Sequence, residues 1–162
     1  MFKVGIITAS DKGARGERED KSAGVIKKMI AEINGEVCEY AVVSDDLNLL
    51  KEKLIEFCGK SLNLVFTTGG TGFSPRDNTP EATRAVIRKI VPGLPEAMRL
   101  GGLKKTPRAM LSRATAGIRG QTLIVNLPGS PIAVQESLEI ILPILAHGLE
   151  KLAGSEEDCA RG

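Results

Sequence analysis

The fold of this chain is decided by the stretch Val65-Phe66-Thr67-Thr68-Gly69-Gly70-Thr71-Gly72-Phe73-Ser74-Pro75-Arg76-Asp77-Asn78-Thr79-Pro80-Glu81-Ala82-Thr83. It predicts a strand that ends near Thr67, because residues 62–66 are apolar and turn residues follow. It predicts a helix that begins after Thr79, a capping residue, with Pro80 at the first helical position. Glycines between the two elements let a bulky anion approach the backbone, and the helix start adds unpaired N–H groups. We therefore expect the chemistry here.

The stretch matches neither of the common nucleotide-binding motifs. A P-loop needs Lys followed by Ser or Thr where this chain has Phe73 and Ser74, and a dinucleotide fingerprint needs glycine where it has Pro75. A glycine-rich turn that only reverses the chain is the alternative. The hydroxyl residues, the arginine and the aspartate between the strand and the helix exceed what a simple turn needs. A ligand-binding loop is the favoured interpretation.

The chain on either side of this stretch alternates predicted strands and helices. Apolar residues at helical spacing predict helices at 22–34, 46–59 and 80–89, and a short helix at 96–103. Apolar runs predict strands at 1–8, 36–43 and 62–67, and a hairpin of 114–118 with 122–126. The last predicted helix, 132–152, is expected to bend or break at Pro143.

This alternation predicts an α/β fold with three layers, in which helices cover both faces of a mostly parallel sheet. No repeat or linker divides the chain, so residues 1–154 are predicted to form one domain and residues 155–162 a polar tail. A chain of 162 residues is long enough to bury a full core without support from a metal or disulfides.

Three loops that follow strands are expected to meet at one edge of this sheet, where ligands bind in such folds. They bring Asp11, Asp45 and Asp77 towards one cleft. Asp45 or Asp46 could merely cap the helix at 46–59, and Asp11 could be a turn residue; for Asp11 and Asp46 taken singly, these structural roles are the favoured interpretation. Asp77 has no such structural explanation, because Thr79 supplies the cap. Asp77 is therefore the strongest candidate for a functional carboxylate.

A second corner between a strand and a helix lies at Pro128-Gly129-Ser130. The N–H groups beyond it suit a second phosphate or a ligand carboxylate. A tight connection in which Ser130 merely caps the last helix is an equal alternative.

Composition excludes several classes of function. A net charge of +2 and 3% aromatic residues leave little basis for nucleic-acid binding. The single histidine, His147, is expected on a helix surface, so Ser-His-Asp and Cys-His catalysis and histidine-rich metal sites are disfavoured. Three widely spaced cysteines, Cys38, Cys58 and Cys159, predict free thiols in a reducing compartment. With no recognisable signal peptide or membrane-spanning run, we expect a cytoplasmic protein without a membrane partner.

Several ordered motifs resemble the signature of molybdopterin-binding domains, over about residues 2–152. They are Thr67-Thr68-Gly69-Gly70-Thr71-Gly72, Arg76-Asp77, Thr79-Pro80-Glu81-Ala82-Thr83, Met110-Leu111-Ser112-Arg113, Ala116-Gly117-Ile118-Arg119-Gly120 and Asn126-Leu127-Pro128-Gly129-Ser130-Pro131. Within that family, the chain resembles the stand-alone molybdopterin adenylyltransferases. The resemblance implies a homotrimer and a Mg²⁺-dependent transfer of AMP from ATP to molybdopterin, which releases pyrophosphate.

The resemblance also implies the site. Asp45 and Asp77 correspond to the functional aspartates of the family and are expected to bind Mg²⁺ or orient phosphates. The expected phosphate and substrate contacts are Thr68, Gly69, Gly70, Thr71, Gly72, Ser112, Arg113, Pro128, Gly129 and Ser130. A module that binds or delivers molybdopterin or a nucleotide without catalysis is the alternative, and a fold relative that hydrolyses another nucleotide is a third.

Overall fold

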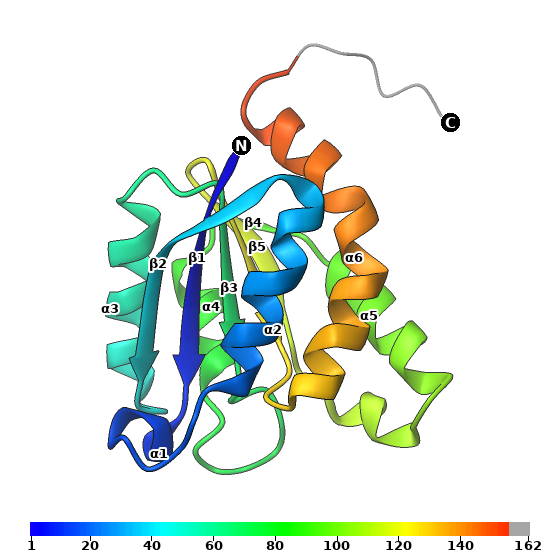
Figure 1. Cartoon of the computed structure of the whole chain (residues 1–162). Helices are drawn as coiled ribbons and strands as arrows, with labels where there is room; N and C mark the ends of the chain where they lie inside the picture. The colour runs from blue at the N-terminus through cyan, green and yellow to red at the C-terminus, as the bar shows by residue number, and fades with distance from the viewer. Residues whose placement is uncertain (156–162) are drawn as a thin grey trace.

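A computed structural model describes residues 1–155 and shows a six-stranded, mostly parallel sheet (Figure 1). The order across the sheet is β2-β1-β3-β6-β5-β4. The strands are β1 (Phe2–Ala9), β2 (Gly35–Val43), β3 (Leu64–Thr68), β4 (Lys89–Ile90), β5 (Ala116–Arg119) and β6 (Thr122–Leu127). The β1–β2, β1–β3 and β3–β6 pairs are parallel, whereas β5 pairs with β4 and β6 antiparallel. The predicted α/β class and the hairpin are confirmed.

Helices cover both faces of the sheet. They are α1 (Asp11–Ala14), α2 (Lys21–Met29) with the 3₁₀ turn η1 (Ile30–Ile33), α3 (Leu47–Cys58), α4 (Thr79–Val86), α5 (Gly93–Leu103), the 3₁₀ helix η2 (Pro107–Leu111) and α6 (Pro131–Leu152). In Figure 1, α3 and α4 lie on one side, with α2, α5 and α6 on the other. The predicted three-layer arrangement is therefore confirmed.

Alternate residues of the central strands enter two separate cores. In β1, Val4 and Ile6 join the core under α2, α5 and α6, whereas Ile7 and Ala9 join the core under α3 and α4. Side chains of a strand point to opposite faces in turn, and here both faces are covered. This explains why the central strands are continuous apolar runs in the sequence. Parallel pairing of these strands brings their carboxyl ends to one edge, where the predicted loops meet.

Two helix boundaries differ from the predictions. The helix predicted to reach residue 89 ends at Val86, because Lys89 and Ile90 pair with β5 at the sheet edge. Thr79 is not its cap: Asn78 holds that position without a side-chain cap bond, and Thr79 is buried as the first helical residue. The other boundaries agree to within a few residues.

The last helix, α6, is continuous across Pro143, so the predicted break is wrong. Proline removes one backbone hydrogen bond, but the neighbouring Leu142 and Leu145 are buried in the core and keep the helix from breaking there. This 22-residue helix is also long and apolar enough, by length and composition, to cross a membrane. The sequence-based expectation of no such run is corrected in that respect. Its buried leucines pack on the sheet, as those of a core helix do.

Other expectations concern single residues. His147 is exposed on α6, as predicted. Cys38 and Cys58 are free thiols, whereas Cys159 lies outside the described residues, as does most of the predicted polar tail.

Candidate functional site

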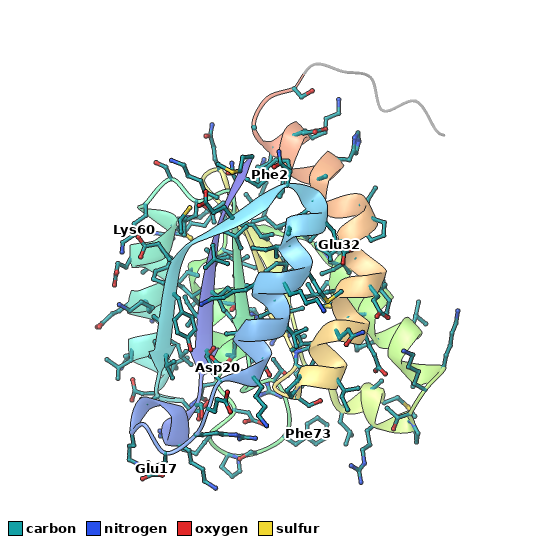
Figure 2. All side chains as sticks on the ribbon, viewed as in Figure 1. Phe2, Glu17, Asp20, Glu32, Lys60 and Phe73 are labelled. Atoms are coloured by element: carbon teal, nitrogen blue, oxygen red, sulfur yellow. The ribbon has the colours of Figure 1, made fainter. Side chains whose placement is uncertain are left out.

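A cavity of about 830 Å³ lies at the carboxyl ends of the parallel strands. In Figure 1 these ends, marked by the arrowheads of β1, β2 and β3, point to the lower edge of the molecule, and Figure 2 labels Glu17 and Asp20 there. Among the predicted site residues, those that line the cavity are Asp45, Asp77, Thr68, Gly69, Gly70, Gly129 and Ser130. The two predicted site aspartates and both strand-to-helix corners therefore open onto one space.

Asp45 follows β2 and exchanges hydrogen bonds with Asp11, which follows β1. The Asp11 N–H donates to Asp45 Oδ2, and the Asp45 N–H donates to Asp11 Oδ1, each over 3.0 Å. Arg76 donates to both Asp11 oxygens, at 2.8 and 3.0 Å, and its hydrogen bond lowers the pKa of Asp11. Partial burial instead raises the pKa of Asp45, with further contributions from the charges of Asp11 and Asp77. Burial thus disfavours the charged form of Asp45, whereas the bond from Arg76 favours the charged form of Asp11.

Asp77 closes the glycine loop on itself. Its Oδ2 accepts a hydrogen bond from the Ser74 N–H over 3.1 Å, and its own N–H donates to the Ser74 carbonyl over 2.9 Å. The same Oδ2 would lie 2.9 Å from a Cβ atom on Gly72. The loop therefore requires glycine at position 72 to hold the Asp77 carboxylate in this place.

The backbone of Gly69 and Gly70 has positive φ angles of 88° and 67°. A Cβ atom on Gly69 would lie 2.5 Å from the Ala9 carbonyl oxygen, so no other residue fits there. A Cβ atom on Gly70 would overlap Thr79 Oγ1 and approach Asp45 Oδ1 to 3.3 Å. These glycines bring the loop backbone close to the end of β1 and to the Asp45 carboxylate.

Ser112 and Arg113 do not line the cavity. The Arg113 guanidinium donates to the carbonyls of Gly72 (2.7 Å) and Asp77 (2.8 Å) and pairs with Glu81, while its N–H donates to Thr71. Arg113 thus holds the glycine loop against the start of α4. Ser112 accepts through its hydroxyl from the Ala114 N–H. Thr71, Gly72 and Pro128 do not line the cavity either.

The Pro128-Gly129-Ser130 corner is packed against the glycine loop. The Thr68 hydroxyl donates to the Pro128 carbonyl over 2.7 Å, and a Cβ atom on Gly129 would lie 3.4 Å from the Gly69 Cα. Ser130 caps α6 by accepting from the Ala133 N–H over 3.1 Å. Ser130 therefore caps α6, as the alternative interpretation predicted, and it also lines the cavity.

Asp20 is a cavity residue that the sequence analysis missed. Its Oδ2 accepts hydrogen bonds from Thr8 and Tyr40, while its Oδ1 caps α2 by accepting from the Ala23 N–H. Burial, and then the bond to Asp20, raises the pKa of Tyr40 to about 12. An aspartate before a helical pattern indicates only a cap, and the two partners become visible only once β1 and β2 pair.

The two aspartates fit a magnesium ion that is bound mainly by its substrate. Within residues 1–155, no group of three or more His, Cys, Asp or Glu side chains is placed to hold a metal. Each of Asp45 and Asp77 keeps one carboxylate oxygen, Oδ1, without a hydrogen-bond partner in that range. Mg²⁺ commonly takes one or two carboxylates and completes its shell with water and substrate phosphates. The donor set suits such an ion and does not suit a closed protein cage.

Comparison with known proteins gives one family. Residues 5–147 match the family model described as "Probable molybdopterin binding domain". The molybdopterin adenylyltransferase of Helicobacter pylori J99 is 41% identical over 155 residues, which are 94% of this chain and 88% of that protein. The enzyme of the same name from Escherichia coli K12 is 35% identical, over 91% of this chain and 80% of its own.

Solved structures agree with this result. The molybdopterin biosynthesis enzyme MoaB of Thermus thermophilus superposes with a TM-score of 0.90 at 51% identity, over 96% of this chain and 98% of that one. Similarity of this extent covers both halves of the sheet and both corners of the cavity.

Proposed function

This chain belongs to the molybdopterin-binding domain family, and from that premise we propose that it is a molybdopterin adenylyltransferase of molybdenum-cofactor biosynthesis. The observation that carries the proposal is the cavity in which Asp45 and Asp77 face the two glycine corners. Relatives that bear this enzyme name match 94% and 91% of this chain, and this extent of similarity supports the proposal.

The proposed reaction joins the terminal phosphate of molybdopterin to the α-phosphorus of ATP. An oxygen of the pterin phosphate forms the new P–O bond, the bond between the α-phosphorus and the bridging oxygen breaks, and pyrophosphate leaves with that oxygen. Transfers of this kind depend on positioning and on neutralised charge more than on a nucleophilic side chain. A cavity without histidine on its wall is compatible with such a mechanism.

Each group on the cavity wall has a proposed role. Asp45 and Asp77 would hold Mg²⁺ through their Oδ1 atoms, and the ion would offset the negative charge of the phosphates. The backbones of Gly69 and Gly70 and of Gly129 and Ser130 would contact phosphate oxygens. Arg113 positions the loop that carries Asp77 and does not reach the cavity.

The decisive experiment measures pyrophosphate released from ATP by the purified protein. Release should require molybdopterin and Mg²⁺ together, and adenylyl-molybdopterin should form in equal amount. Molybdopterin that binds without pyrophosphate release would identify the non-catalytic delivery protein instead. ATP turnover that ignores molybdopterin would identify a hydrolase of the same fold.

We propose further that the enzyme is a homotrimer that works in the cytoplasm. Support for assembly comes from apolar side chains exposed on two neighbouring helices: Leu100 and Leu103 on α5, and Met110 and Leu111 on η2. Monomeric proteins rarely expose several large apolar residues together unless they mark an interface. The free thiols Cys38 and Cys58 suit a reducing compartment.

A further inference from the structure

The Pro128-Gly129-Ser130 corner is fixed by hydroxyl groups from two different elements. Thr68, the last residue of β3, donates to the Pro128 carbonyl over 2.7 Å. Ser22, in the first turn of α2, donates to the Gly129 carbonyl over the same 2.7 Å, although it lies 107 residues away in the chain. Ser22 is buried, lines the cavity, and belongs to none of the motifs that define the family resemblance.

These two bonds determine which way the peptide groups of the corner face. No peptide bond among the described residues is cis, so the C=O and N–H of each peptide point in opposite directions. Because both carbonyls point to hydroxyl donors, the N–H groups of Gly129 and Ser130 are turned away from those donors. Neither N–H has an acceptor within residues 1–155, and both residues line the cavity. The two hydroxyls thus leave two backbone donors available to a ligand.

Ser22 is itself held in place by the cavity wall. Asp20 caps α2 through the Ala23 N–H, and the same carboxylate accepts from Thr8 at the end of β1 and from Tyr40 on β2. The first turn of α2 is therefore tied to two strands before it reaches across to Gly129.

We propose that Ser22 is a positioning residue for the nucleotide phosphates, which holds the Gly129–Ser130 peptide so that its N–H donates to a phosphate oxygen. The proposal rests on the proposed function, which places phosphates at this corner. Without the Ser22 hydroxyl the peptide has no fixed direction, since glycine on its N-terminal side allows it to rotate. Ser22 acts through this peptide.

The test compares Ser22→Ala with Thr122→Val. Thr122 is a matched control, because its buried hydroxyl also donates to a carbonyl, that of Leu62, over 2.7 Å, at the end of the sheet opposite the cavity. Each change removes one such bond and should lower the thermal midpoint by about 2–4 °C. Isothermal titration with ATP and Mg²⁺, and separately with pyrophosphate and Mg²⁺, then measures the affinity of the corner for phosphates.

Ser22→Ala should weaken both ligands by about tenfold and raise the KM for ATP, with the KM for molybdopterin unchanged. Thr122→Val should leave all these constants as in the wild type, and Ser22→Thr, which keeps a hydroxyl, should restore ATP affinity. Thr68→Val should reproduce the effect of Ser22→Ala on ATP. Wild-type affinity in Ser22→Ala, or an equal loss in Thr122→Val, would overturn the role of Ser22 alone. A wild-type protein that binds neither ATP nor pyrophosphate would overturn the proposed function itself.

Discussion

Asp77 and Asp45 share the cavity but differ in their surroundings. Asp77 is held by the loop that precedes α4, and only one of its oxygens has a backbone donor. A bare carboxylate beside two phosphate-bearing substrates would repel them unless a cation intervened. Asp77 is therefore expected to act through Mg²⁺, and its charge should matter more than its shape.

Asp77→Asn should lower adenylyl transfer by at least about 100-fold while molybdopterin affinity stays near that of the wild type. The asparagine keeps the size of the side chain and its bond to the Ser74 N–H, and repulsion of the phosphates is relieved. Turnover and pterin binding are measured on the same preparation. Asp46→Asn is the control, because Asp46 caps α3 outside the cavity wall and asparagine caps as well. Near-normal turnover in Asp77→Asn, or a collapse of pterin affinity, would show that the magnesium role is wrong.

Asp45→Asn should separate stability from activity. Burial raises the pKa of Asp45 in the folded state above its unfolded value. Between these two values the folded state binds more protons, so the free energy of unfolding falls as pH rises. Asparagine is uncharged and so removes the cost of burying the ionised carboxylate. The thermal midpoint of the Asp45→Asn protein should therefore exceed that of the wild type at pH 7 but approach it at low pH. Turnover should fall at least about 100-fold. A midpoint at pH 7 below that of the wild type would contradict the assignment.

Single residues are predictable where one local pattern decides their role. Asp45, Asp77 and the glycines follow strands, and parallel strands bring such residues to one edge. The role of Arg113 is not predictable, because the partners of its three guanidinium nitrogens lie up to 41 residues away in the chain. Thr79 precedes Pro80, and this position predicts a cap. In the structure Thr79 is instead the first residue of α4 and packs against Gly70. The role of Asp20 becomes apparent only when its hydrogen-bond partners on β1 and β2 are known.

At the scale of elements, the glycine loop depends on one arginine from beyond η2. Arg113→Met should lower the free energy of unfolding by about 2 kcal/mol, or the thermal midpoint by about 4–8 °C, because two carbonyls and Glu81 lose their partner. Turnover should fall further than stability, since the loop that carries Asp77 loses its support. Calorimetry and pyrophosphate release measure the two effects.

Lys53→Met is the control for this change. Lys53 pairs with Glu56 on the outer surface of α3, and exposed pairs of this kind contribute at most about 1 kcal/mol. Its midpoint and turnover should match the wild type. An Arg113→Met protein with full activity would mean that the loop holds its shape without the guanidinium.

The limits of two helices, α4 and α6, could not be predicted from the sequence. The end of α4 is set by the pairing of Lys89 and Ile90 with β5, a contact that only the folded sheet reveals. The continuity of α6 across Pro143 is set by burial of its leucines. Local propensity predicted both elements, and tertiary packing decided their limits.

At the scale of the whole molecule, the fold was predictable because both faces of the sheet are covered. Apolar strands alternate with amphipathic helices, and this order permits few topologies. The sheet changes from parallel to antiparallel pairing at β6 and β5, because the hairpin at residues 119–122 is too short to connect two parallel strands. Assembly was not predictable in this way, because apolar residues near 92–107 suit a core and an interface equally.

The exposure of Leu100 and Met110, at 66% and 64%, favours the interface. Light scattering at micromolar concentration should give a particle of three times the 17.2 kDa chain mass. Leu100→Glu with Met110→Glu should yield monomers, because burying two carboxylates costs more than the apolar contact supplies. Leu49→Glu on α3 is the control: it is also an exposed leucine, but it lies on the opposite face of the sheet, and its variant should stay trimeric. A wild-type monomer, or a double variant that remains a trimer, would place the interface elsewhere or remove it.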